Sequence, residues 1–184
     1  GVAIPDALTD MPGNPFMGCI QLVFISLSST NPRLEMKDGV LFDNEEKRLI
    51  CYPCAAISKE YEVPEGTEII GVSSFENCTY PVHITLPSTV KTIGDFAFSN
   101  CYSLEEIDVP DSVEQIGIWA FESCINLKRF TVPSKITELN MSLFNRDNQL
   151  VEVVLPDGLT VIGDNVFTDC KSLTNINLPD GLTT

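Results

Sequence analysis

The sequence predicts a solenoid, a fold in which short structural repeats stack in one direction. Six prolines are each separated from the next by the same number of residues, at Pro64, Pro87, Pro110, Pro133, Pro156 and Pro179. Apolar residues recur at fixed distances from these prolines. Such a strict period indicates repeats that cannot bury their apolar side alone and therefore pack against their neighbours.

Each unit carries the same set of apolar positions. Counted from the proline, an apolar residue stands at offset six and a phenylalanine at offset eleven, and apolar residues return at offsets twenty and twenty-two. The phenylalanines are Phe75, Phe98, Phe121, Phe144 and Phe167. At offset fourteen stand Cys78, Cys101, Cys124, Asp147 and Cys170. Positions that stay apolar in every unit indicate a continuous buried core.

The last apolar pair of each unit predicts a strand. Offsets twenty and twenty-two are two residues apart, so they share one face of an extended segment. We expect parallel strands at about residues 82–86, 105–109, 128–132, 151–155 and 174–178. The following proline ends each strand, and the glycine-containing stretch after it permits a turn into a short helical or 3-10 arc on the other side. The phenylalanines should stack in one buried column.

The repeat resembles the BspA-like family of bacterial leucine-rich repeats, whose pattern runs roughly L-x-x-I-x-L-P-x-x-V-x-x-I-G-x-x-A-F-x-x-C. Residues 104–124 read LEEIDVPDSVEQIGIWAFESC, and the pattern covers residues 64–184. The resemblance implies a leucine-rich-repeat solenoid of the β-rich α/β repeat class. It also implies a protein-binding or adhesion module of a bacterial surface or secreted protein, with an extracellular or cell-surface location and host or extracellular-matrix proteins as partners.

We interpret the whole chain, residues 1–184, as one solenoid. Residues 1–27 are a degenerate repeat, and residues 28–63 are an irregular repeat whose segment 38–53 predicts a β-hairpin, because apolar runs flank a polar turn. The regular repeats are 64–86, 87–109, 110–132, 133–155 and 156–178, followed by a truncated repeat at 179–184. Because that last unit is unfinished, we expect either end-to-end self-association or a frayed tail after about Leu178.

The charge balance excludes some partner classes. The chain has 26 acidic and 11 basic residues and a net charge of −15. This charge repels phosphate backbones and anionic lipid headgroups, so we expect no nucleic-acid partner and favour cationic or neutral ligands. No stretch approaches the roughly 18 consecutive apolar residues of a membrane-spanning helix, so we expect no direct membrane insertion. The first residues also lack a signal-peptide pattern.

No motif predicts an enzyme, a metal site or a cofactor. The only histidine, His83, occupies an outward strand position. Cys51 and Cys54 have the C-x-x-C spacing of redox sites, but Pro53 ends a strand there and no second pair completes a zinc site. A thiol-redox enzyme at this pair is the least favoured alternative. We interpret the repeat cysteines as small, buried and reduced core residues, because parallel inward thiols suit a disulfide poorly.

The outward strand positions are the candidate binding surface, because packing does not fix their identity. Offset nineteen holds Phe24, His83, Glu106, Arg129, Glu152 and Asn175. Offset twenty-one holds Ser26, Thr85, Asp108, Thr131, Val154 and Asn177. Charge and size change from unit to unit at these positions, as they would on either a recognition surface or a merely solvated one. A structural spacer that holds other domains apart is therefore the alternative to a binding module.

Overall fold

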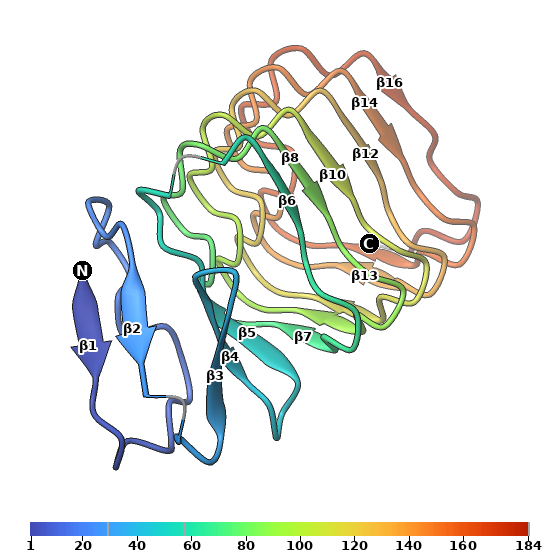
Figure 1. Cartoon of the computed structure of the whole chain (residues 1–184). Helices are drawn as coiled ribbons and strands as arrows, with labels where there is room; N and C mark the ends of the chain where they lie inside the picture. The colour runs from blue at the N-terminus through green and yellow to red at the C-terminus, as the bar shows by residue number, and fades with distance from the viewer. Residues whose placement is uncertain (29, 57, 184) are drawn as a thin grey trace.

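The computed structural model describes residues 1–28, 30–56 and 58–183. Figure 1 shows coils stacked one after another from the N-terminus to the C-terminus. The strands on one side define the strand face, which consists of β6 (Glu60–Glu62), β8 (His83–Thr85), β10 (Glu106–Asp108), β12 (Arg129–Thr131), β14 (Glu152–Val154) and β16 (Asn175–Ile176). The hydrogen-bonded pairs of strands on this face are all parallel. The predicted solenoid and its five parallel strands are therefore confirmed, and β6 is an additional strand of the same face.

A second, shorter ladder of strands lies on the return side of the coils. Its two-residue strands are β7 (Ile69–Ile70), β9 (Thr92–Ile93), β11 (Gln115–Ile116), β13 (Glu138–Leu139) and β15 (Val161–Ile162). They coincide with the apolar residue at offset six, which the sequence marked as a core position without predicting a strand. Each inward side chain of this ladder faces the core that the strand face covers from the opposite side.

The prediction of helical or 3-10 arcs is wrong, because the described residues contain no helix. The arcs are runs of turns, each with two residues of positive φ, such as Phe96 (55°) and Asn100 (59°). Backbone amides alternate between two partners: Phe98 N donates to Ala120 O of the next coil (2.8 Å), whereas Ser99 N donates to Phe96 O of its own arc (3.1 Å). An α-helix needs its successive amides for bonds within the segment, and here the neighbouring coil takes half of them.

The N-terminal part adds one small sheet and extends the return ladder by three strands. In the degenerate repeat, β1 (Val2–Ile4) pairs in parallel with β2 (Ile25–Leu27). The predicted hairpin is confirmed as the antiparallel pair β4 (Val40–Asp43) and β5 (Arg48–Cys51), to which β3 (Leu34–Lys37) adds a third antiparallel strand. Because β5 also pairs in parallel with β7, this irregular unit continues directly into the regular ladder.

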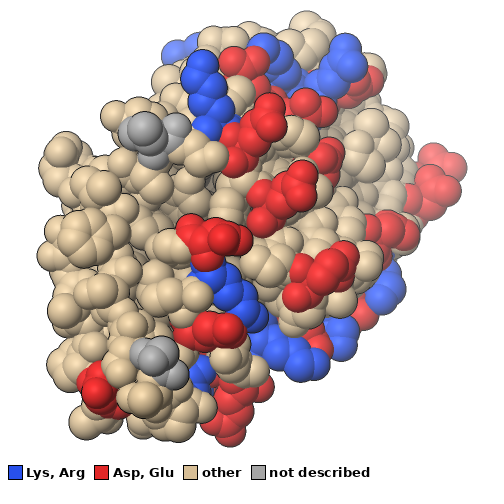
Figure 2. Space-filling model, viewed as in Figure 1, with Lys and Arg blue, Asp and Glu red and all other residues tan. Residues whose placement is uncertain are grey.

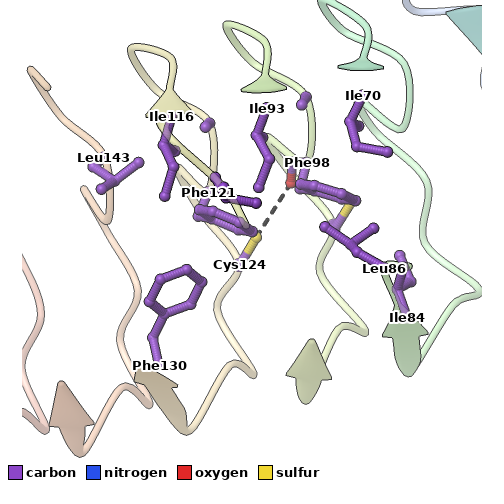
Figure 3. Packing of buried hydrophobic residues seen from close by; sticks show 14 of the residues in the cluster. Ile70, Ile84, Leu86, Ile93, Phe98, Ile116, Phe121, Cys124, Phe130 and Leu143 are labelled. Atoms are coloured by element: carbon purple, nitrogen blue, oxygen red, sulfur yellow. Dashed lines mark hydrogen bonds between the residues drawn. The ribbon is translucent and has the colours of Figure 1, made fainter. Parts of the chain in front are cut away.

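The buried column of phenylalanines is confirmed. Ring centroids are separated by 5.0, 5.2, 5.9 and 5.8 Å along the series Phe75, Phe98, Phe121, Phe144 and Phe167. The first four rings are fully buried. In Figure 3 the rings of Phe98 and Phe121 stack between the isoleucines of the return ladder and the inward residues of the strand face. Every coil thus contributes one ring to a core shared with its neighbours.

The interpretation of the repeat cysteines as buried, reduced core residues holds for part of the series. Cys101 and Cys124 are fully buried, and the Cys124 thiol donates to the carbonyl oxygen of Phe98 (3.2 Å; Figure 3). Cys170 is only partly buried, and two further members differ more from the prediction. Cys78 is not reduced but forms a disulfide with Cys54, whose Cα lies 4.3 Å away. Cys19 is exposed rather than buried. Cys54 belongs to the irregular unit, so the parallel stacking that disfavours a bridge between regular repeats does not apply to it.

Native thiol labelling should separate the free cysteines by burial. Cys19 is exposed, whereas burial raises the pKa of Cys101 and Cys124 above the usual range, and only the thiolate reacts. We expect a maleimide reagent to modify Cys19 within minutes, and Cys101 and Cys124 only after the chain is unfolded. Peptide mass spectrometry after labelling at several times measures this order. Fast native labelling of Cys101 or Cys124 would contradict their placement in the core.

Both strand ladders are interrupted at one boundary between coils. β8 pairs with β10 and β12 with β14, but β10 and β12 are not paired; likewise β9 pairs with β11 and β13 with β15, but β11 and β13 are not paired. At the preceding boundary, Leu86 N donates to Asp108 O (3.0 Å), but no such bond joins Val109 and Thr131 one coil later. The return arcs stay hydrogen-bonded across the interruption. The core and the arcs therefore hold the two halves together.

A single departure from the repeat explains the break between β11 and β13. Offset seven is glycine in the other four regular repeats but Asn140 in this one. The glycine is needed because the preceding coil lies very close: a Cβ on Gly94 would stand 2.7 Å from Val72 N. Asn140 carries a Cβ, so its coil must lie farther from its neighbour. The Asn140 amide then donates to Ile116 O (2.5 Å), replacing the bond that a glycine backbone N–H makes at other boundaries.

Replacing Gly94 by alanine is expected to reproduce this displacement where the ladder is now intact. The added methyl group would meet backbone atoms, which cannot rotate away, so we expect a loss of about 1 to 3 kcal/mol in the free energy of unfolding. The matched control is Gly158→Ala, where the nearest atom to the added Cβ is Ser134 O at 4.0 Å. Urea titration of both variants measures the difference. Equal stability of the two variants would contradict the close-approach explanation.

The C-terminal residues keep the repeat geometry as far as the structure describes them. Thr183 N donates to Thr160 O (3.0 Å), and Leu182 packs against the core. The expected fraying after Leu178 is therefore not observed through residue 183. End-to-end self-association stays a prediction.

Candidate binding surface

Ten of the twelve candidate binding residues lie on the strands of the strand face or directly after them. The parallel register places His83 beside Glu106 and Thr85 beside Asp108. On the other side of the interruption, the register aligns Arg129, Glu152 and Asn175 on neighbouring strands. Thr131 occupies the other outward position of β12. Phe24 and Ser26 are the exceptions. Ser26 lies in β2 of the separate N-terminal sheet, and Phe24, which is 57% exposed, directly precedes that strand. The phase shift in the irregular repeat removes both residues from the face.

Two acidic residues of the face were not predicted from the sequence. The register pairs Glu60 with His83 and Glu62 with Thr85, so β6 extends both outward rows by one strand. Both side chains are exposed. Counting back one repeat length from His83 and Thr85 leads to these positions, so the sequence does carry a signal for them. The insertion in residues 28–63 hides that signal, because the repeat loses its phase there.

Side-chain contacts divide the face into two clusters. In the first, Asp108 Oδ2 lies 2.9 Å from His83 Nε2 and accepts a hydrogen bond from Thr85 Oγ1 (3.2 Å). In the second, Glu152 lies 3.5 Å from Arg129 Nε and accepts a bond from the Asn175 amide (2.5 Å). The interruption between β10 and β12 runs between the clusters. Each half of the strand face therefore presents its own polar arrangement.

Acidic residues at the edges of the coils are paired with lysines, whereas several on the face are not. Glu68 contacts Lys47 and Lys91, Glu105 contacts Lys128 and Glu114 contacts Lys135. The hydrogen bond from the neighbouring lysine lowers the pKa of the Glu68 and Glu114 carboxyl groups. Among the described residues, no cation lies within 4 Å of Glu60, Glu62 or Glu106. Figure 2 shows acidic side chains across the middle of this face and basic ones gathered along its edges.

A groove of about 750 Å³ lies where the strand-face ladder is interrupted. Glu106, Asp108 and Val109 line it from β10 and the turn that follows, and Lys128 and Arg129 line it from the other side. Ile107 at its base is only partly buried, whereas the equivalent Ile84 in the intact part is fully buried. The opened boundary therefore hollows the middle of the surface that carries the candidate residues.

The two cysteines of the C-x-x-C pair are not bonded to each other. Cys54 is bonded to Cys78, and Cys51 is buried, which raises the pKa of its thiol to about 12. Among residues 1–28, 30–56 and 58–183, no cluster of histidine, cysteine and carboxylate groups could hold a metal ion. The same residues include no helix long and apolar enough to cross a membrane. The strand face is the one surface where the predicted residues converge.

Comparison with known proteins matches the repeat that builds this surface. Residues 50–174 and 137–184 match the BspA type leucine-rich repeat region, in six copies. The chain belongs to this family. No curated protein matches the chain in sequence. Membership in this family confirms the resemblance that the repeat pattern carried, and the family is one of leucine-rich-repeat proteins.

Solved structures share this BspA-type fold. A leucine-rich cell surface protein from Faecalibacterium prausnitzii is 28% identical, with a TM-score of 0.89 over 95% of this chain and 46% of that one. A leucine-rich repeat protein from Eubacterium ventriosum is 27% identical, with a TM-score of 0.93 over 98% of this chain and 49% of that one. The pneumococcal vaccine antigen PcpA, at 24% identity and a TM-score of 0.86, covers 100% of this chain and shares the fold. This chain spans less than half of each of the three.

Proposed function

We propose that this chain is a protein-binding module of a bacterial surface protein and that it recognises its partner through the strand face. The observation that carries the proposal is the contrast between inward and outward positions of the same strands. Inward residues such as Ile84 and Val153 stay apolar, whereas outward residues such as His83, Glu106 and Arg129 change from coil to coil. Extended solenoid faces with variable outward residues are common binding surfaces.

The cell-surface location and an adhesive role are part of the same proposal. The similar protein from F. prausnitzii is described as a cell surface protein, which supports this location. The Cys54–Cys78 disulfide also favours an oxidising environment, because such bonds persist outside the cytosol. We propose host or extracellular-matrix proteins as the partner class. The spacer function remains the outcome if the face binds nothing.

The test compares substitutions on the strand face with substitutions elsewhere. The face variant changes Glu106, Asp108, Arg129 and Glu152 to serine. Asp95 and Glu114 are acidic residues outside the face, but substituting them would also remove contacts within the protein. Asp95 accepts a hydrogen bond from the Ile118 amide (2.9 Å), and Glu114 forms an ion pair with Lys135. The control variant therefore changes three exposed carboxylates outside the face to serine, namely Glu65, Glu138 and Asp164.

Binding of each variant to a panel of purified host and matrix proteins is measured by surface plasmon resonance. We expect the face variant to lose at least tenfold in affinity, or about 1.4 kcal/mol, for any protein that binds the unmodified chain. The thermal midpoint should change little, because Glu106, Asp108 and Arg129 are exposed and Glu152 is only half-buried, and surface substitutions usually stay within about 0.5 kcal/mol. A loss in the control variant alone would disprove the assignment to the strand face. Absence of binding to the whole panel would favour a spacer.

A further inference from the structure

Four carboxylates lie on β6 and β10, the two strands that flank β8. The register places Glu60 and Glu106 on either side of His83, and Glu62 and Asp108 on either side of Thr85. Neighbouring strands lie about 4.8 Å apart, so β6 and β10 are separated by about two strand spacings. Only Asp108 has partners, in His83 and Thr85. The repulsion among the others has no local compensation.

The acidic residues of β6 and β10 differ from those at the coil edges. Lysines compensate acidic residues at the coil edges, where Glu105 and Glu114 each contact one within 2.6 Å. The basic residues across the groove are also occupied, since Lys128 contacts Glu105 and Arg129 contacts Glu152. Among the described residues of the strand face, the acidic side chains without a cation within 4 Å, Glu60, Glu62 and Glu106, therefore all lie on β6 and β10.

The groove adds backbone groups to this acidic area. Where the ladder is intact, the residue after each strand donates its amide to the next coil, as Val63 does to Thr85 O (3.0 Å) and Leu86 to Asp108 O (3.0 Å). Val109 has no such bond and lines the groove. A protein segment lying in the groove therefore meets Glu106, Asp108 and the free Val109 amide together, and the β6 carboxylates lie beyond β8 on the same face. Extended peptides that bind sheets use such free backbone groups of a strand.

We propose that the face of β6, β8 and β10, with the groove beside it, binds an extended protein segment that carries lysine or arginine at every second position. This inference rests on the proposed function and specifies the chemistry of the partner. In an extended segment, every second side chain points the same way, at intervals of about 6.6 Å. Glu60 and Glu62 on β6, and Glu106 and Asp108 on β10, are also two residues apart on extended strands. A cation at every second position therefore matches their spacing.

The probe is a synthetic peptide of six Lys-Ser pairs, with Gln-Ser and Glu-Ser peptides of the same length for comparison. The face variant carries Glu60→Gln, Glu62→Gln and Glu106→Gln. The control variant carries Glu65→Gln, Glu138→Gln and Asp164→Asn, three exposed carboxylates outside the face. Both variants remove three negative charges, so they differ only in where the charge is lost. Circular dichroism of both variants checks that they are folded.

Isothermal titration calorimetry at 0.15 M salt measures the affinity. We expect the Lys-Ser peptide to bind the unmodified chain, and the face variant to lose at least tenfold in affinity while the control variant changes less than about threefold. Equal losses in the two variants would show general attraction to a negative protein and overturn the proposal. Stronger binding of the Gln-Ser peptide, or no binding of the Lys-Ser peptide, would overturn it as well.

A separate result distinguishes this inference from the proposed function. If a protein partner binds through the strand face but keeps its affinity for the Glu60, Glu62 and Glu106 variant, recognition by the face stands and the cationic segment is wrong. If no protein partner depends on any face residue, the proposed function itself fails.

Discussion

Replacing Phe121 by alanine is expected to lower the free energy of unfolding by about 3 to 5 kcal/mol, the usual cost of truncating a buried aromatic residue. The Phe121 ring is fully buried and lies in the middle of the column, 5.2 Å from Phe98 and 5.9 Å from Phe144 between ring centroids. It also contacts Phe130 at 4.9 Å. The cavity would open at the boundary where both ladders are interrupted and where the hydrogen bonds of the return arcs, such as Phe121 N to Leu143 O (3.1 Å), still join the coils.

Urea titration followed by circular dichroism measures this loss. The matched control is Tyr102→Ala, which truncates an exposed aromatic residue (43% exposed) of the adjacent coil. We expect the control to change stability by no more than about 0.5 kcal/mol. A loss below about 1 kcal/mol for Phe121→Ala would mean that the column does not hold the coils together.

The repeat period is enough to predict the strands and the column. Residues at offsets eleven, twenty and twenty-two are apolar in every regular unit, and stacking identical units brings identical positions together. The period alone therefore assigns Phe98 and Phe121 to one column. The candidate face follows from the same argument, since a residue between two inward positions, such as Asp108 between Ile107 and Val109, must point outward.

The return arcs could not be predicted in the same way, because the glycine-containing sequence allows either a helix or a series of turns. The choice depends on the carbonyl groups of the next coil, which take the amides of residues such as Phe75 and Phe98. The local sequence alone does not show whether these amides bond within the arc or to the next coil. The interruption is similar: Asn140 is visible as a departure from glycine, but its effect depends on how closely the coils approach.

The departure at offset fourteen has the clearest energetic consequence. Asp147 replaces the repeat cysteine and is fully buried, and neither carboxylate oxygen has a hydrogen-bond partner. In neighbouring coils the thiol donates to a carbonyl oxygen of the preceding coil, as Cys124 does to Phe98 O (3.2 Å) and Cys170 to Phe144 O (3.0 Å). An ionised carboxylate has no hydrogen to donate. Only a protonated Asp147 supplies the donor that this position uses elsewhere.

Burial raises the pKa of Asp147 well above its ordinary value, and the nearby Cys124 backbone offsets this only in part. The folded state therefore holds the proton more tightly than the unfolded state. The stabilisation from proton binding is fully present below the unfolded pKa, near 3.8, and is lost as the pH rises through the raised folded value. This direction is opposite to that of an ion-paired carboxylate, so at neutral pH the buried group should destabilise the fold.

Replacing Asp147 by cysteine is therefore expected to stabilise the chain by about 2 to 3 kcal/mol at pH 7, the order of the cost of a buried unsatisfied polar group. The difference from the unmodified chain should shrink as the pH falls toward 4, where Asp147 is protonated in the folded state and increasingly so in the unfolded state. Urea titrations at pH 4, 5.5 and 7 measure both effects. The control is Asp157→Asn, which removes an exposed carboxylate and should give a nearly constant difference. If Asp147→Cys stabilises equally at all three pH values, Asp147 is not protonated in the folded core.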